Sequence, residues 1–281
     1  MPARITVHLA PASGRALVPP AHTGPGVNAA FLAALRDAGE DDLAKALHGA
    51  GSPKPYALTP LVDERNRRAE ASSAKVRFEI GVLADPLTGP ILQALAATPV
   101  MRVARCVYQV AAVELIGAEP YPELLADARP GDRWGMDIRT PVAFFTAREE
   151  GARRVRVFPE PEWVFADLHR RWRAFASEPA SEPAALDEAV GEAVTGHLEV
   201  TDHRLSMAEH LVKAGAPPGR GSVGEVAYRV VDAHRLGLAT LASLDALMRF
   251  SAYSGIGDRT AVGMGYVLPS FGPPQPEGPL R

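Results

Sequence analysis

Residues 224–265, GEVAYRVVDAHRLGLATLASLDALMRFSAYSGIGDRTAVGMG, carry the pattern that decides the fold. Alternating apolar residues predict a strand over 223–231, and the long apolar run after it predicts a helix over 235–253. A glycine-rich loop follows, and the sequence predicts a last strand over 261–267. Strand, helix, loop and strand in this order are the second half of a βαββαβ unit.

The glycine-rich loop over 254–265 invites comparison with phosphate-binding loops. Gly257-Asp258-Arg259 lacks the Gly-Lys-Ser/Thr that a Walker loop requires. A dinucleotide loop follows a strand and opens a helix, whereas here the helix comes first and turns its negative end toward the loop. The sequence therefore argues against a nucleotide cofactor, and any anion must be bound by loop N–H groups and Arg259. In the alternative interpretation, the glycines serve only to cap the helix and to allow close packing.

Both halves of the chain show the same order of elements. The first half has predicted strands over 4–9, 75–83 and 101–115 and predicted helices over 28–37, 41–48 and 86–97; the second half has predicted strands over 138–146 and 196–208 and a helix over 160–175 ahead of the stretch quoted above. We expect an α+β protein of two tandem ferredoxin-like (RRM-like) βαββαβ domains.

The expected domains cover residues 1–128 and 129–270, and the proline-rich tail over 271–281 is expected to be disordered. The acidic segment 177–196 is predicted to be a flexible insertion in the second domain. Neither half shows the aromatic strand motif of RNA-recognition domains, so the fold alone does not establish RNA binding.

Composition limits the classes of protein and of site. The single cysteine, Cys106, excludes an internal disulfide and a cysteine-built zinc site, and it fits a reducing cytoplasm. No apolar run reaches the length of a membrane helix, and the first residues lack the pattern of a signal peptide. We therefore expect a soluble cytoplasmic protein. The net charge of −3 argues against nucleic acid, but five acidic residues lie within 177–196 and the remainder is slightly basic, with arginine far in excess of lysine.

The stretch 224–265 resembles the C-terminal part of the CRISPR-associated protein six family, the endoribonucleases that cut CRISPR repeat RNA. Four further segments resemble family elements in the right order: LVPPAHTGPGVNAAFLAAL (17–35), LAKALHGAGSPKPYALTPL (43–61), IRTPVAFFT (138–146) and VFPEPEWVFADLHRRWRAFA (157–176). The resemblance implies the tandem ferredoxin-like fold and a metal-independent cleavage by the 2′-hydroxyl, with no cofactor. It also implies CRISPR repeat RNA as partner, and other CRISPR effector-complex proteins as further candidates.

Two catalytic candidates follow from the resemblance. His48 matches the family's catalytic histidine, and its place at the end of a short helix favours the imidazolium form that a general acid requires. In the alternative, His48 only caps the last carbonyls of that helix. Lys54 matches a family lysine near the active site, where it would stabilise charge on the phosphate, unless it is a solvated loop lysine. No His/Asp/Glu cluster at metal-ligand spacing stands out, so no metal site is expected.

The resemblance also places the glycine-rich loop against the RNA. Its matching residues are Gly255, Gly257, Arg259, Thr260, Gly263 and Gly265. Arg170, Arg171 and Arg173 are further candidates for backbone contacts, although a solvated helix face is the favoured interpretation for them.

One residue departs from the family pattern. Some members carry a tyrosine on the first helix that acts with the histidine, and here Phe31 stands in its place. A phenyl ring transfers no proton, so either His48 acts without that partner, or Tyr56 or His22 takes the role. Phe31 also favours the nearest alternative function, a catalytically weak subunit that binds repeat RNA. The net negative charge favours a second alternative, a ferredoxin-like scaffold that binds a ligand or a protein.

Overall fold

The computed structural model describes residues 1–12, 19, 21–64, 69, 75–146, 154–176, 185–211 and 218–272. The expected disordered tail lies outside the described residues from 273 onward, and so do residues 177–184 of the acidic segment. Within the described ranges, no helix is long and apolar enough to cross a membrane.

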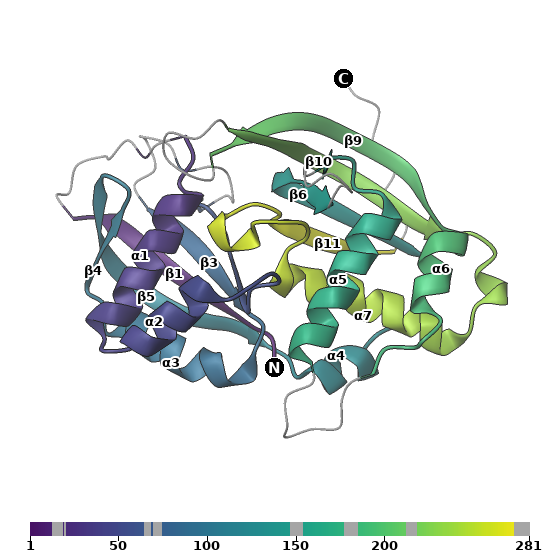
Figure 1. Ribbon diagram of the computed structural model, residues 1–281, viewed down its shortest axis with the longest axis horizontal. Coiled ribbons are helices and arrows are strands. Elements are labelled where there is room, and N and C mark those ends of the chain that lie inside the picture. The colour runs from purple at the N-terminus through teal and green to yellow at the C-terminus, as the bar shows by residue number, and fades with distance from the viewer. Residues whose placement is uncertain are drawn as a thin grey trace.

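The N-terminal half forms an antiparallel sheet with the strand order β2-β3-β1-β5-β4 (Figure 1). Its strands are β1 (Ala3–Pro11), β2 (Tyr56–Leu58), β3 (Val76–Val82), β4 (Val100–Val103) and β5 (Cys106–Ala118), and its helices are α1 (Gly24–Asp37), α2 (Asp41–Gly49) and α3 (Asp85–Ala96). Because side chains alternate between the two faces of a strand, Ile5, Val7 and Leu9 of β1 all point into the core, where they are buried.

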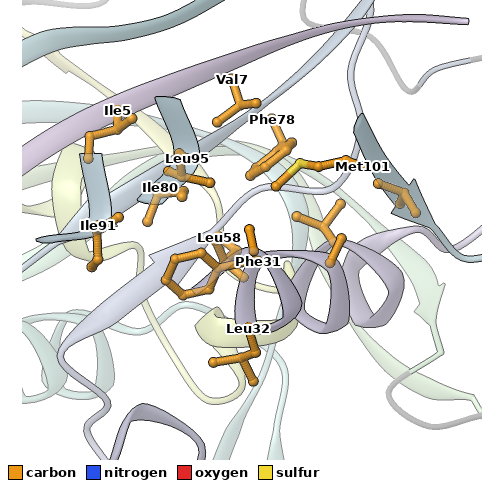
Figure 2. Packing of buried hydrophobic residues seen from close by; sticks show 14 of the residues in the cluster. Ile5, Val7, Phe31, Leu32, Leu58, Phe78, Ile80, Ile91, Leu95 and Met101 are labelled. Atoms are coloured by element: carbon orange, nitrogen blue, oxygen red, sulfur yellow. The ribbon is translucent and has the colours of Figure 1, made fainter. Parts of the chain in front are cut away.

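Figure 2 shows the core of this half between the sheet and α1. Ile5 and Val7 of β1 and Phe78 and Ile80 of β3 lie in one buried cluster with Phe31 of α1. Each fully buried side chain of this size stabilises the fold by about 1.5–3 kcal/mol. The residue that replaces the expected tyrosine, Phe31, is therefore a core residue with no exposed surface.

The C-terminal half forms a second antiparallel sheet with the order β11-β6-β10-β9. Its strands are β6 (Arg133–Val142), β9 (Leu198–His210), β10 (Gly219–Val230) and β11 (Val267–Phe271), and α5 (Pro161–Phe175), α6 (Val190–His197) and α7 (Leu238–Ser254) pack against it. A small separate hairpin joins β7 (Phe144–Thr146) to β8 (Arg154–Arg156). The core includes Trp134, Phe165, Trp172 and Phe250.

In both sheets, the first strand of the half lies inside the sheet between the third and the last strand of its βαββαβ unit. This arrangement is the ferredoxin-like topology, with the hairpin β4–β5 extending the first sheet by one strand. The predicted fold class, two tandem ferredoxin-like units, is confirmed.

The two halves are connected through α4 (Tyr121–Ala126), just ahead of the proposed division between residues 128 and 129. Tyr121 and Leu124 pack in the second core, and the Tyr121 hydroxyl donates a hydrogen bond to the Leu83 carbonyl at 2.9 Å. The connection is thus packed against both halves.

Three predicted strands are wrong in their extent. The strand expected over 138–146 covers parts of β6 and β7, which belong to different sheets. The other two are wrong for backbone reasons. The strand expected over 101–115 is a hairpin, because Ala104 adopts φ = 54° and reverses the chain between β4 and β5. The strand expected over 261–267 begins only at Val267, because Gly263 and Gly265 have φ of 83° and 69°, which an extended strand does not allow. A single 3₁₀ turn, η2 (Thr260–Val262), stands before them.

The acidic segment is not wholly a flexible insertion. Its last residues form α6, where Val190, Ala193 and Val194 are buried at the i, i+3, i+4 spacing of a helix face. The acidic side chain of Glu192 lies in the first turn of this helix, where it interacts favourably with the helix dipole.

The two halves meet where α7 lies against β3. Gly81 of β3 faces the backbone of Tyr253 so closely that a Cβ at position 81 would overlap the Tyr253 carbonyl oxygen. Gly24 of α1 lies in the same way against the carbonyl of Val262. Glycine at these positions lets the backbones of the two halves approach each other directly.

We expect Gly81→Ala to lower the free energy of unfolding by about 1–3 kcal/mol, because the added methyl must push α7 away from β3. Urea unfolding followed by circular dichroism measures the change. The matched control is Gly191→Ala in α6, where no atom lies within 4 Å of the new Cβ and the stability should not fall. Equal stability of the two variants would contradict the proposed close contact.

Candidate functional site

His48 lies in the last turn of α2 with its side chain exposed. The carbonyls at this helix end are bound by Lys54, whose Nζ donates to the oxygens of Leu47 at 2.7 Å, His48 at 2.8 Å and Ala50 at 3.1 Å. The ammonium group therefore caps the negative end of α2, and burial lowers its pKa. Lys54 is a capping residue rather than a solvated loop lysine, and it performs the capping that the sequence alternative had assigned to His48.

Tyr56 and His22 are the two groups considered as replacements for the missing tyrosine. Tyr56 is buried against Phe31, with ring centroids 5.2 Å apart, and its hydroxyl donates to Asn28 Oδ1 at 2.9 Å. Burial raises the pKa of Tyr56 to about 12, which makes it a weak proton donor near neutral pH. His22 lines a cavity of about 270 Å³ between the two halves, and neither His48 nor Lys54 lines this cavity.

The same cavity holds a second histidine that sequence motifs did not single out. The His210 ring lies 5.9 Å from that of His22, and its Nε2 is 2.9 Å from the Val262 carbonyl oxygen. Burial lowers the pKa of His210, although the hydrogen bond with Val262 acts in the opposite direction. In the described ranges, no group of three or more His, Cys, Asp or Glu side chains is placed to hold a metal ion.

The glycines of the loop are buried, and their role is conformational. Gly255, Gly257, Gly263 and Gly265 all have positive φ, between 59° and 83°. A Cβ on Gly265 would overlap the Ile256 carbonyl, and one on Gly257 would come within 2.8 Å of the Ala143 oxygen. The loop thus folds back on itself and on the end of β6, and side chains larger than hydrogen are excluded at these positions.

Arg259 is the exposed basic residue of this loop. It adopts φ = 65°, and its guanidinium lies 4.8 Å from the centroid of the Phe145 ring. Thr260 beside it is only 4% exposed, and its Oγ1 accepts a hydrogen bond from Arg171 Nη1 at 3.1 Å. The loop therefore offers the Arg259 side chain to solvent and keeps Thr260 inside.

A buried ion pair in α5 holds the loop. Arg171 Nε donates to Asp167 Oδ2 at 2.9 Å, and the same oxygen accepts the Gly257 backbone N–H at 2.8 Å. Arg171 also donates to the carbonyl oxygens of Gly257 and Ser254. The expectation of a solvated arginine face is wrong for Arg171, which is only 2% exposed.

Asp167 is the residue that sequence reasoning missed. The signal was present, because an aspartate four residues before an arginine on a helix forms an i, i+4 pair. What the sequence did not indicate is that this pair faces the glycine-rich loop, about 90 residues later in the chain.

Residues 136–267 match the family described as CRISPR-associated endoribonuclease Cas6. Among the curated proteins, none matches the sequence significantly. A solved Cas6 product complex is 26% identical over 96% of this chain and 100% of its own, with a TM-score of 0.77. A structure of Thermus thermophilus Cas6 is 26% identical over 96% and 98%, with a TM-score of 0.70.

A second Cas6 product complex has a TM-score of 0.73 at 23% identity, over 96% of this chain and 99% of its own, and shows the shared fold. The family resemblance that the sequence indicates is thereby confirmed.

We expect Asp167→Asn to lower the free energy of unfolding by about 3–5 kcal/mol, because it leaves the buried Arg171 guanidinium without its counter-charge. The double variant Asp167→Leu/Arg171→Met should recover much of this loss, since it removes both charges. The control is Asp232→Asn, which breaks an exposed i, i+3 pair with Arg235 and should cost less than about 1 kcal/mol. Urea unfolding measures the free energy of unfolding of all three variants. An equal decrease for Asp167→Asn and for Asp232→Asn would contradict a stabilising role of the buried pair.

Proposed function

Because the chain shares the Cas6 fold over nearly its whole length and the Cas6 sequence pattern over residues 136–267, we propose that it is an endoribonuclease that processes CRISPR repeat transcripts (pre-crRNA) into crRNA. The observation that carries the proposal is His48, which is exposed at the capped end of α2 and free to approach an RNA strand.

In the proposed reaction, the 2′-hydroxyl oxygen attacks the adjacent phosphorus and a P–O2′ bond forms. The P–O5′ bond breaks, His48 as imidazolium gives its proton to the leaving 5′-oxygen, and the 2′-hydroxyl proton passes to water. The products are a 2′,3′-cyclic phosphate and a 5′-hydroxyl. The scheme needs no oxidant, no added nucleophile and no metal ion.

Lys54 supports this reaction through its position. Its three carbonyl contacts hold the last turn of α2, and so hold His48 in place, without contributing to the chemistry directly. Phe31 and Tyr56 are fully buried, so neither takes part in proton transfer to the RNA in this proposal. His48 then acts without the tyrosine partner that some family members have.

Arg259 is the proposed RNA contact of the glycine-rich loop. Its side chain is exposed, whereas Thr260 and the four loop glycines are buried and shape the loop that presents it. A guanidinium can bind a phosphate in a bidentate manner, and the Arg259 side chain remains exposed beside the Phe145 ring.

The buried Phe31 also favours a second candidate, a subunit that binds repeat RNA but cleaves it poorly, within a CRISPR effector complex. The two candidates differ in one measurable property, the cleavage rate of bound RNA.

We expect the protein to cut a synthetic RNA carrying one repeat of the host's CRISPR array in the presence of EDTA, and to leave intact the same RNA with a 2′-deoxy residue at the cut site. His48→Ala should slow cleavage at saturating protein by at least ~10²-fold while the dissociation constant is unchanged. The exposed His234→Ala serves as the matched control and should cut at the wild-type rate.

Binding without cleavage by the wild type would support the second candidate. Neither binding nor cleavage would favour the scaffold. Normal cleavage by His48→Ala would contradict the role of His48.

For Arg259→Ala we expect weaker binding of the 2′-deoxy repeat RNA and a salt dependence shallower by about 0.7 in log–log slope, because one phosphate contact is lost. Filter binding at several salt concentrations measures both quantities. Arg235→Ala, an exposed arginine in the 3₁₀ turn η1 (Ala233–Arg235), is the control. A dissociation constant and slope equal to those of the wild type would argue against Arg259 as an RNA contact.

A further inference from the structure

The proposed reaction places extra negative charge on the phosphate as the fifth bond to phosphorus forms, and a positive group nearby stabilises that charge. Lys54 is close to His48 in the sequence, but an ammonium group has three donors. All three are directed to the carbonyls of Leu47, His48 and Ala50. While α2 keeps this cap, Lys54 has no donor left for a phosphate.

Arg170, a cation from the C-terminal half of the molecule, contacts the loop that follows α2. Arg170 lies in α5, and its Nη1 is 3.5 Å from the Ser52 hydroxyl oxygen. Ser52 follows His48 by four residues, and Lys54 folds this loop back onto the end of α2. In Figure 1 the chain leaving α2 runs toward α5. The contact of Arg170 with Ser52 therefore joins the two halves of the molecule at the loop that follows α2.

The position of Arg170 is fixed from its own helix. Its Nη2 donates to Asp167 Oδ1 at 2.5 Å, while 46% of the side chain remains exposed. The other oxygen of Asp167 is occupied by Arg171 and by the Gly257 N–H. The guanidinium is therefore oriented by one edge, and the remaining donors face solvent and the Ser52 loop.

The charges of Asp167, Arg170 and Arg171 do not sum to zero. One carboxylate, Asp167, pairs with two guanidinium groups, so one positive charge is in excess. Arg171 is 2% exposed and fully engaged with the glycine-rich loop. The excess positive charge is thus presented at the half-exposed Arg170, beside the His48 loop.

We propose that Arg170 binds the RNA phosphate on which His48 acts, supplying from α5 the positive charge that Lys54 does not supply. The inference rests on the proposed endoribonuclease function. The contact with the Ser52 hydroxyl is long and its acceptor is neutral, and a phosphate oxygen in its place gives a hydrogen bond with charge on both the donor and the acceptor. The site is then built from both halves, with the acid from α2 and the phosphate contact from α5.

The test uses the repeat RNA and its 2′-deoxy form with Arg170→Met, Arg170→Lys and the control Arg235→Met. Arg235 is a fair control because it also follows an aspartate by three residues, but in η1. Arg170→Met should slow cleavage at saturating protein by about 10²-fold, in line with the loss of one donor to the developing charge. It should also reduce the log–log salt slope of 2′-deoxy RNA binding by about 0.7.

Arg170→Lys keeps the charge and the pairing with Asp167 but loses the planar fork, so the salt slope should stay near that of the wild type while cleavage slows about tenfold. The Lys variant keeps the test decisive if the Met variant unfolds, which thermal melting detects. Wild-type cleavage rates and slopes in the folded Arg170 variants overturn the inference while the proposed function stands. If the wild type leaves the ribose RNA intact, the proposed function fails, and the assignment of Arg170 fails with it.

Discussion

The glycine-rich loop depends on the buried ion pair between Asp167 and Arg171. Burying two charges is costly unless each polar atom finds a partner, and here the loop supplies them: the Gly257 N–H to the carboxylate, and the carbonyls of Gly257 and Ser254 with the Thr260 hydroxyl to the guanidinium. The pair and the loop are therefore each incomplete without the other. Left-handed backbone at four glycines lets the chain adopt the shape that these contacts require.

Asp167 also links this loop to the proposed reaction centre. One carboxylate oxygen accepts from Arg171 and Gly257, and the other accepts from Arg170, which extends to Ser52 in the loop after α2. The exposed Arg259 thus lies on a loop that is held from α5, and the exposed His48 lies at the end of α2, just before the loop that Arg170 contacts. The two halves also meet directly at the contact between β3 and α7, where Gly81 allows the close approach of the Tyr253 backbone.

Much of the architecture was predictable because it follows from local periodicity. Apolar alternation identified β1 and β3, and helical spacing identified α5 and α7. The failures have specific causes. The turn at Ala104 has no glycine, asparagine or proline to mark it, so the sequence predicts one strand where the structure has two. The predicted last strand begins earlier than β11 because it includes the glycines of the preceding loop, whose positive φ values the sequence does not reveal.

The sequence by itself determined the order of most elements, the two ferredoxin-like units, the family resemblance and the candidate residues His48 and Arg259, because these depend on patterns within short segments. Only the tertiary structure decided which groups Lys54, Arg170 and Arg171 contact. Their roles depend on partners that are distant in the chain or that become available only when it folds: the carbonyls at the end of α2, the Ser52 loop, and the carbonyls around Gly257. An arginine or lysine has the same chemistry wherever it occurs, and whether it caps a helix, pairs in the core or faces a phosphate is set by which groups the fold brings within hydrogen-bonding distance.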